Sequence, residues 1–330
     1  MKQQSKIILS LAVILIASTI LSHQYTYAWG FWAHKRINRV AVFTLPVEMI
    51  GFFKENIEYV TEHAIDPDKR RYAVDGEAPK HYIDIDYYCA FPHDCMPHNY
   101  EEAVKKFSED TLLTYGTSPW NLEREYHYLK KAFATKDAKR ILKRAADFGH
   151  YLGDIHVPLH TTINYNGQLT GQKGIHGFWE SRIPELMGEN YDYYIGKARY
   201  IEDINEEIWS IVMSSSAAVD SVLFYEQQLT DEYETDKKYS FEDRGEIFMK
   251  TYSSEFTKDY NYMIADMSHR RMRMTIISLG SFWYTAWVDA GSPDLSDLTS
   301  IEFTEEEIEE MEKLDKQFRE GKIKGREHWD

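Results

Sequence analysis

Polar and apolar residues alternate with a helical period along most of the chain. Apolar positions recur every three or four residues over 31–44, 136–156 and 202–229, as in amphipathic helices. Similar stretches predict the other helices, at residues 48–61, 101–115, 118–134 and 254–289. A helix that opens at Ile175 is expected to be kinked or ended by Pro184. The pattern therefore predicts an all-α protein.

Nothing in the sequence divides these helices into separate units. Irregular stretches rich in Pro or Gly interrupt them at residues 63–80 and 164–174. No repeat of fixed period and no Gly-Ser linker is present in the sequence. We therefore expect one multi-helix domain over residues 29–300. The acidic segment 301–330 is expected to be a solvated helix or a partly disordered tail.

The first 28 residues have the three parts of a secretory signal peptide. Lys2 and Lys6 precede an apolar run at residues 7–21, and Thr26 and Ala28 are small residues suited to a cleavage site. The alternative is a membrane span, but about 20 apolar residues are needed to cross a bilayer. We expect cleavage after Ala28 and export to the periplasm or the extracellular medium.

Composition narrows the possible partners. Hydrophobic residues make up 43% of the chain and aromatic residues 15%, enough to fill a sizeable core. The formal net charge is −16, and removal of the leader takes away two lysines and no acids. Binding to duplex DNA depends on neutralising phosphates with Lys and Arg, so stable binding to duplex DNA is not expected.

Two cysteines, Cys89 and Cys95, enclose five residues. In an exported protein such a pair favours a disulfide over a metal site or a redox couple. Two reduced thiols in a loop are the alternative.

Histidines and carboxylates recur at one spacing. His150 and Asp154 are four residues apart on one predicted helix, and His176 and Glu180 repeat that spacing. Side chains at i and i+4 lie on the same helix face, and imidazole with carboxylate suits zinc. His160 follows the proline that ends the first of these helices. The spacing thus indicates a metal site in the helical core, whereas His156 is expected to be structural.

A longer ordered set of residues carries a family resemblance. Its members are Trp29, His34, the Asp pair of DPD, His81, His150, Asp154, His160, His176 and Glu180. This set resembles the zinc-dependent phospholipase C and single-strand-specific zinc nuclease superfamily. The resemblance implies an all-α domain of that type with three zinc ions in a cleft. Glu at position 180 is similar to the phospholipases, whereas the nucleases have Asp there.

The resemblance also implies a ligand set for each ion. The first zinc would be held by Asp66, His81, His150 and Asp154, with Asp68 as the alternative to Asp66. The second would be held by His34, by Asp154 as a bridge, and by the amino nitrogen and carbonyl oxygen of Trp29. The third would be held by His160, His176 and Glu180.

Catalysis in such a site would use a metal-activated water. Two zinc ions can generate hydroxide near neutral pH and clamp phosphate oxygens, so no side-chain nucleophile is needed. Asp154 would set the metal separation, and Asp66 or Asp68 would orient the water or act as base. A Trp29 amine would exist only after leader cleavage, so a chain with extra residues before Trp29 is expected to lose zinc and activity.

The sequence leaves three functions open. The first is a phospholipase C-like hydrolase acting on a phospholipid or another phosphodiester. The second is a nuclease for single-stranded DNA or RNA. The third is a zinc-binding surface protein without turnover. The oligomeric state stays open.

Overall fold

The computed structural model describes residues 30–244, 247–298, 301–321 and 323–324. In this part of the chain the protein is mainly α-helical, with one two-stranded sheet. The helical class expected from the sequence is confirmed at this level, and the sheet departs from it. The predicted leader and Trp29 lie outside the described residues.

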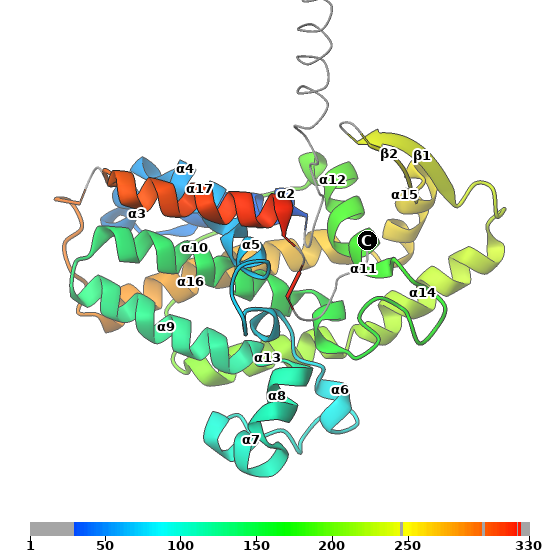
Figure 1. Ribbon diagram of the computed structural model, residues 1–330, viewed down its shortest axis with the longest axis horizontal. Coiled ribbons are helices and arrows are strands. Elements are labelled where there is room, and N and C mark those ends of the chain that lie inside the picture. Colours follow the sequence, from blue (N-terminus) through cyan, green and yellow to red (C-terminus); the bar gives the residue numbers. More distant parts are fainter. Residues whose placement is uncertain (1–29, 245–246, 299–300, 322, 325–330) are drawn as a thin grey trace, which may run out of the picture.

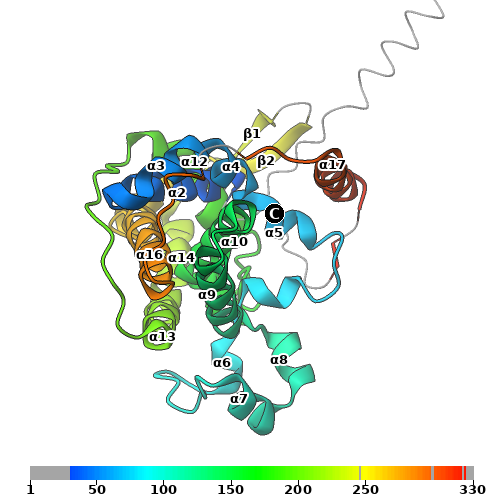
Figure 2. The same cartoon turned by 90° about the vertical axis from the view of Figure 1, so that its left-hand side faces the viewer.

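Four helices pack together at the centre of the molecule (Figures 1 and 2). They are α2 (Phe31–Ala41), α9 (Ser118–Ala134), α10 (Ala138–His156) and α16 (Met267–Asp289). Helix α10 is the innermost, and every residue from Ala145 to His156 is buried. A helix this enclosed is normally apolar on all sides. The ionisable side chains within this stretch therefore need partners inside the protein.

Four predicted helices are each divided in two. Residues 48–61 form α3 (Val47–Glu55) and α4 (Ile57–Glu62), and residues 101–115 form α7 (Tyr100–Phe107) and α8 (Glu109–Tyr115). Residues 202–229 form α13 (Ile204–Ser216) and α14 (Val219–Glu232). Residues 254–289 form α15 (Ser254–Met263) and α16. At Ser108 the backbone has a φ of 72°, and its side chain accepts a hydrogen bond from the Thr111 amide. Ala265 and Asp266 also have positive φ, between α15 and α16. Capping by Ser108 thus interrupts the apolar period between α7 and α8.

The segment that opens at Ile175 stays helical past Pro184. It comprises α11 (Ile175–Gly177), a π-helical turn (Phe178–Arg182) and α12 (Ile183–Met187). Pro184 lies in the first turn of α12, where its missing N–H costs no hydrogen bond. The irregularity therefore precedes the proline, in the π-helical turn.

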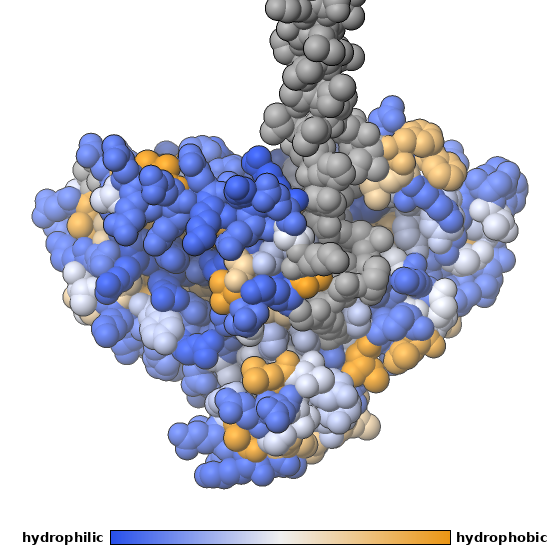
Figure 3. Space-filling view, viewed as in Figure 1, coloured by the Kyte–Doolittle hydropathy of each residue, from blue (hydrophilic) through white to orange (hydrophobic). Residues whose placement is uncertain are grey.

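The sequence pattern did not predict the β-hairpin. Strands β1 (Tyr239–Arg244) and β2 (Ile247–Tyr252) pair antiparallel beside α15 (Figure 1). Phe241 and Phe248 stack on it with ring centroids 5.6 Å apart, and each is about two-thirds exposed, at 64% and 67%. Figure 3 shows a hydrophobic surface over the hairpin. The hairpin is joined to the π-helical turn because Arg182 donates to Glu242 and to the Tyr252 carbonyl.

A small helical lobe projects at the bottom of Figures 1 and 2. It contains α6 (Ile85–Tyr88), α7 and α8, and a disulfide joins Cys89 to Cys95 in the loop between α6 and α7. The lobe is connected to the body through a short 3₁₀ helix, Ala78–His81, which is followed by an extended residue, Tyr82.

The acidic C-terminal segment forms helix α17 (Glu305–Glu320), which begins at a capping box made by Thr304 and Glu307. It has no buried residue, but it contacts α5 (Asp66–Arg70). Phe318 lies against Phe31, with ring centroids 5.6 Å apart, and against Tyr72, at 5.1 Å. The C-terminal helix therefore docks beside the start of α2.

Candidate metal centre

Predicted ligand residues from distant parts of the chain meet in three buried groups. The groups are His34, His150 and Asp154; Asp68, His81 and His150; and His160, His176 and Glu180. Within each group the candidate ligand atoms lie within 4.8 Å of one another. Because His150 belongs to two groups, those two are adjacent.

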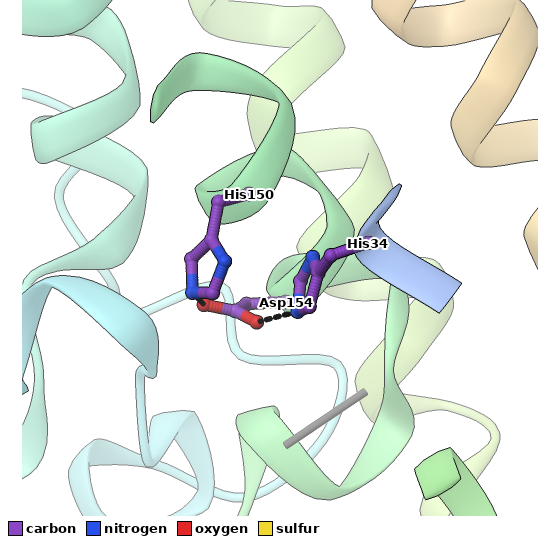
Figure 4. Close-up of side chains that lie close together, drawn as sticks. All are labelled: His34, His150 and Asp154. Carbon is purple, nitrogen blue, oxygen red and sulfur yellow. Dashed lines mark ion pairs between the residues drawn. The ribbon is translucent and has the colours of Figure 1, made fainter. Parts of the chain in front are cut away.

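The first group joins α2 to α10. Figure 4 shows His34 of α2 and His150 and Asp154 of α10 pointing toward one another. His34 Nε2 lies 3.4 Å from Asp154 Oδ1, and His150 Nε2 lies 3.5 Å from Asp154 Oδ2. All three residues have an exposed fraction of 0%.

A glycine allows the two helices to approach so closely. A Cβ on Gly149 would lie 2.0 Å from Asn38 Oδ1. Asn38 in turn donates from Nδ2 to the carbonyls of Val60 and Ala146, which holds α2 against α4 and α10. The close contact of Gly149 with Asn38 therefore places His34 beside His150.

The second group adds residues from α5 and from the 3₁₀ helix. His81 Nδ1 lies 3.0 Å from Asp154 Oδ2 and 3.1 Å from His150 Nε2. Asp68 Oδ1 lies 3.6 Å from His150 Nε2 and 3.7 Å from His81 Nδ1. The two oxygens of Asp154 thus point to different groups, Oδ1 to His34 and Oδ2 to His81 and His150.

Asp68 lies in this group, and Asp66 does not. Asp66 is 2.6 Å from His63 Nδ1 and 3.1 Å from Lys69 Nζ. Residues two apart on a helix do not share a face, so α5 can direct only one of the pair to the site. The geometry therefore favours Asp68, the alternative at sequence level, over Asp66 as ligand and as base.

The third group is built around the π-helical turn, a feature frequent at functional sites. Glu180 Oε1 lies 3.0 Å from His176 Nε2, and Glu180 Oε2 lies 3.2 Å from His160 Nε2. The i, i+4 pair of His176 and Glu180 therefore converges as its spacing predicts. His160 reaches the same carboxylate from the turn after α10.

Three of these histidines donate Nδ1–H to backbone carbonyls. The acceptors are Ala64 for His150 at 2.9 Å, His81 for His160 at 2.6 Å and Tyr165 for His176 at 3.0 Å. A carbonyl only accepts, so a neutral imidazole must carry its proton on Nδ1 and leave a lone pair on Nε2.

These lone pairs face carboxylate oxygens, which are also acceptors. Acceptors about 3 Å apart repel unless a cation lies between them, either a proton or a metal ion. Ligand atoms of a tetrahedral zinc are about 3.3 Å apart. The separations in the third group match that value.

Buried oxygens without hydrogen bonds give a second indication of a missing cation. Among the described residues, both carboxylate oxygens of Asp68 and Oδ1 of Asp154 accept no hydrogen bond and are inaccessible to solvent. Buried polar atoms are almost always satisfied, and metal coordination would satisfy these. The nitrogen and oxygen donor set fits zinc.

The electrostatics of the site also favour a cation. Burial raises the pKa of Asp154 to about 7, opposed by His150 and His160 and reinforced by Asp68 and Glu180. Burial lowers the pKa of His34 to about 4. Burial therefore disfavours the charged forms of Asp154 and His34, and a divalent ion would favour the ionised carboxylate of Asp154.

The residue after Trp29 also lies at the site. The Gly30 amide donates to the Glu180 carbonyl at 3.1 Å. A Cβ on Gly30 would be 3.3 Å from Ser181 Oγ. Trp29 itself, predicted to ligate through its backbone, lies outside the described residues.

His156, expected to be structural, is buried, and its Nδ1 donates to the Leu152 carbonyl. The sequence analysis missed a set of polar residues behind His81, namely Glu77, Arg70 and Tyr151. Glu77 and Tyr151 are buried, Arg70 is partly buried, and the three are hydrogen-bonded to one another. Glu77 lies four residues before His81, the spacing that marks the other pairs, whereas Arg70 and Tyr151 reach it only once α5 and α10 pack together.

No protein-family model and no curated protein sequence matches this chain.

Proposed function

We propose that this chain is an exported zinc-dependent hydrolase that cleaves phosphate esters and is phospholipase C-like in its substrate. The observation that supports the proposal most strongly is the convergence of His, Asp and Glu side chains in three buried groups, two of which share His150. Their deprotonated nitrogens face carboxylate oxygens, and within the described part of the chain buried oxygens of Asp68 and Asp154 accept no hydrogen bond. The family resemblance of the sequence implies that these groups bind zinc ions.

The ligand assignment follows the three groups. Asp68, His81, His150 and Asp154 would hold one zinc ion. His34 and Asp154, with the backbone of Trp29, would hold a second. His160, His176 and Glu180 would hold a third, and with only three protein ligands this ion would keep a position open, as catalytic sites do.

When bound, zinc ions of this kind supply a hydroxide near neutral pH and neutralise the charge of a phosphate group. The protein's own residues arrange the surroundings. The two oxygens of Asp154 point to different groups, so this carboxylate sets their spacing. Asp68 accepts no hydrogen bond from any residue that the structure describes, and it would be the carboxylate available to take a proton from a water. Asp66 is held by His63 and Lys69 and does not serve this role.

Charge and surface chemistry favour a lipid over a nucleic acid. The net charge of −16 disfavours a polyanionic substrate. The exposed Phe241 and Phe248 lie on a hairpin joined through Arg182 to the turn that carries Glu180. Exposed aromatic side chains suit the interface of a lipid aggregate. A phospholipid presented in a bilayer is therefore the preferred substrate class.

The test is hydrolysis by zinc-loaded protein that begins at Trp29. Phosphatidylcholine vesicles are compared with a single-stranded oligonucleotide, and release of phosphocholine is expected to exceed cleavage of the oligonucleotide. His150→Ala is expected to abolish turnover, whereas His127→Ala, at an exposed histidine of α9, keeps it. Preferential cleavage of the oligonucleotide would instead identify a nuclease. Zinc binding without turnover of either substrate would leave a metal-binding protein.

A further inference from the structure

His81 differs from the other ligand histidines in the nitrogen that it presents to the centre. His150, His160 and His176 donate from Nδ1 to backbone carbonyls and present Nε2. His81 presents Nδ1, which lies 3.0 Å from Asp154 Oδ2 and 3.1 Å from His150 Nε2. Its Nε2 therefore lies on the opposite side of the ring and needs a partner of its own.

Glu77 lies on that side. His81 Nε2 is buried and makes no hydrogen bond to any residue that the structure describes. Glu77 Oε1 lies 4.0 Å from it, one helical turn earlier in the chain. Both residues are 1% exposed, so water does not compete for the contact.

Neighbouring side chains fix the Glu77 carboxylate in place. Lys80 Nζ donates to Oε2 at 2.5 Å, and Arg70 Nε donates to Oε1 at 3.3 Å. The Tyr151 hydroxyl also donates to Oε1, and Tyr151 follows His150 directly in α10. Two cations and a phenol thus hold an ionised carboxylate behind His81. Burying a carboxylate together with its charged partners carries a desolvation penalty, which favours a specific role for this carboxylate.

We propose that Glu77 is a positioning residue for the metal centre, accepting the Nε2–H of His81 so that the Nδ1 lone pair faces the ion. This inference rests on the proposed function, because it presumes that His81 is a ligand. Metal-bound histidines usually donate their other N–H to a carboxylate or a carbonyl, which fixes the tautomer and raises the basicity of the ligand. A shift of the ring by about 1 Å brings the 4.0 Å separation to hydrogen-bond length.

A role of Glu77 in positioning also explains why a carboxylate lies here, when three of the other four ligand histidines use backbone carbonyls. An anionic acceptor polarises an imidazole more strongly than a neutral one does. His81 would then be more basic than His150, His160 and His176, and its Nδ1 lies 3.0 Å from Asp154, the proposed bridging carboxylate.

The experiment measures zinc affinity by competition with a chromophoric chelator, with no substrate present. In Glu77→Gln the amide is nearly isosteric, but it carries no charge. One of the three zinc ions is expected to bind about 10- to 100-fold more weakly, the range seen when such a partner is lost. The other sites should be unchanged. The matched control is Glu125→Gln, at a buried glutamate paired with Arg144, which should leave all affinities unchanged.

A second readout separates positioning from a purely structural role. In zinc-loaded wild-type protein, the Nε2 proton of His81 should be protected from exchange in ¹⁵N-edited NMR spectra, and Glu77→Gln should lose that protection. If Glu77→Gln does not fold, Glu77→Asp serves instead, because it keeps the charge but moves it away from the ring. Wild-type affinity at all sites in a folded Glu77 variant would overturn the inference. Failure of the wild-type protein to bind zinc would instead reject the proposed function.

Discussion

Replacing Gly149 by alanine should separate the two helices that build the first metal group. The added Cβ would lie 2.0 Å from Asn38 Oδ1, 2.8 Å from Asn38 Cγ and 2.9 Å from Leu279 Cδ2. A gap of about 1.4 Å therefore has to open between α2 and α10 before the contact becomes an ordinary one. His34 moves with α2, away from His150 and Asp154.

The magnitude follows from three effects. Overpacking in a filled core costs about 1–3 kcal/mol. The two buried hydrogen bonds that Asn38 donates, to Val60 and Ala146, contribute about 1 kcal/mol each and would be strained or lost. Alanine favours the helix over glycine by about 1 kcal/mol, which offsets part of this. We expect Gly149→Ala to lower the free energy of unfolding by about 2–4 kcal/mol.

The assay is urea denaturation of the metal-free protein, followed by circular dichroism, together with the zinc content of the loaded protein. The matched control is Gly51→Ala, because Gly51 is also helical and a Cβ there meets nothing within 4 Å. That control should gain up to about 1 kcal/mol and keep its zinc. If Gly149→Ala is as stable as the wild type and binds as much zinc, the close contact of α2 with α10 does not build the site.

Three further predictions test separate parts of the molecule. Asp68→Asn should lower the zinc content by about one ion per chain whereas Asp66→Asn should not, as measured by elemental analysis; equal losses would contradict the geometry of α5. Replacing both Phe241 and Phe248 by serine should slow hydrolysis of phosphatidylcholine vesicles about tenfold or more but leave a soluble short-chain analogue unaffected; an equal loss on both substrates would remove the hairpin from lipid binding. Phe318→Ala should weaken the docking of α17 by about 1–2 kcal/mol, seen as faster limited proteolysis near residue 300; an unchanged rate would show that other contacts hold the helix.

The sequence predicted the parts of the fold where a strong helical period coincides with a local start signal. Ser118 and Pro119 begin α9, and the helix runs to Ala134, as predicted. Where the period was strong but a residue imposed another backbone conformation, the prediction failed. Ser108 divides one predicted helix, and Asp266 helps to divide another.

The candidate site was predictable to the extent that its residues lie at helical spacing. His176 and Glu180 converge because their spacing survives the π-helical turn. The choice between Asp66 and Asp68 could not be made, because two residues in one short helix look alike until its packing is known. Glu77 was not anticipated although it lies at i, i+4 spacing before His81; only its contacts with Arg70 and Tyr151 depend on tertiary packing.

Elemental analysis of protein purified with zinc present and beginning at Trp29 tests the central claim most directly. The proposed centre predicts about three zinc ions per chain, decreasing in His150→Ala, which removes a residue shared by two of the groups, and in Glu180→Ala, which opens the third. His127→Ala should keep the wild-type content. Zero or one zinc ion in the wild-type protein would contradict the trinuclear centre and the hydrolase proposed from it.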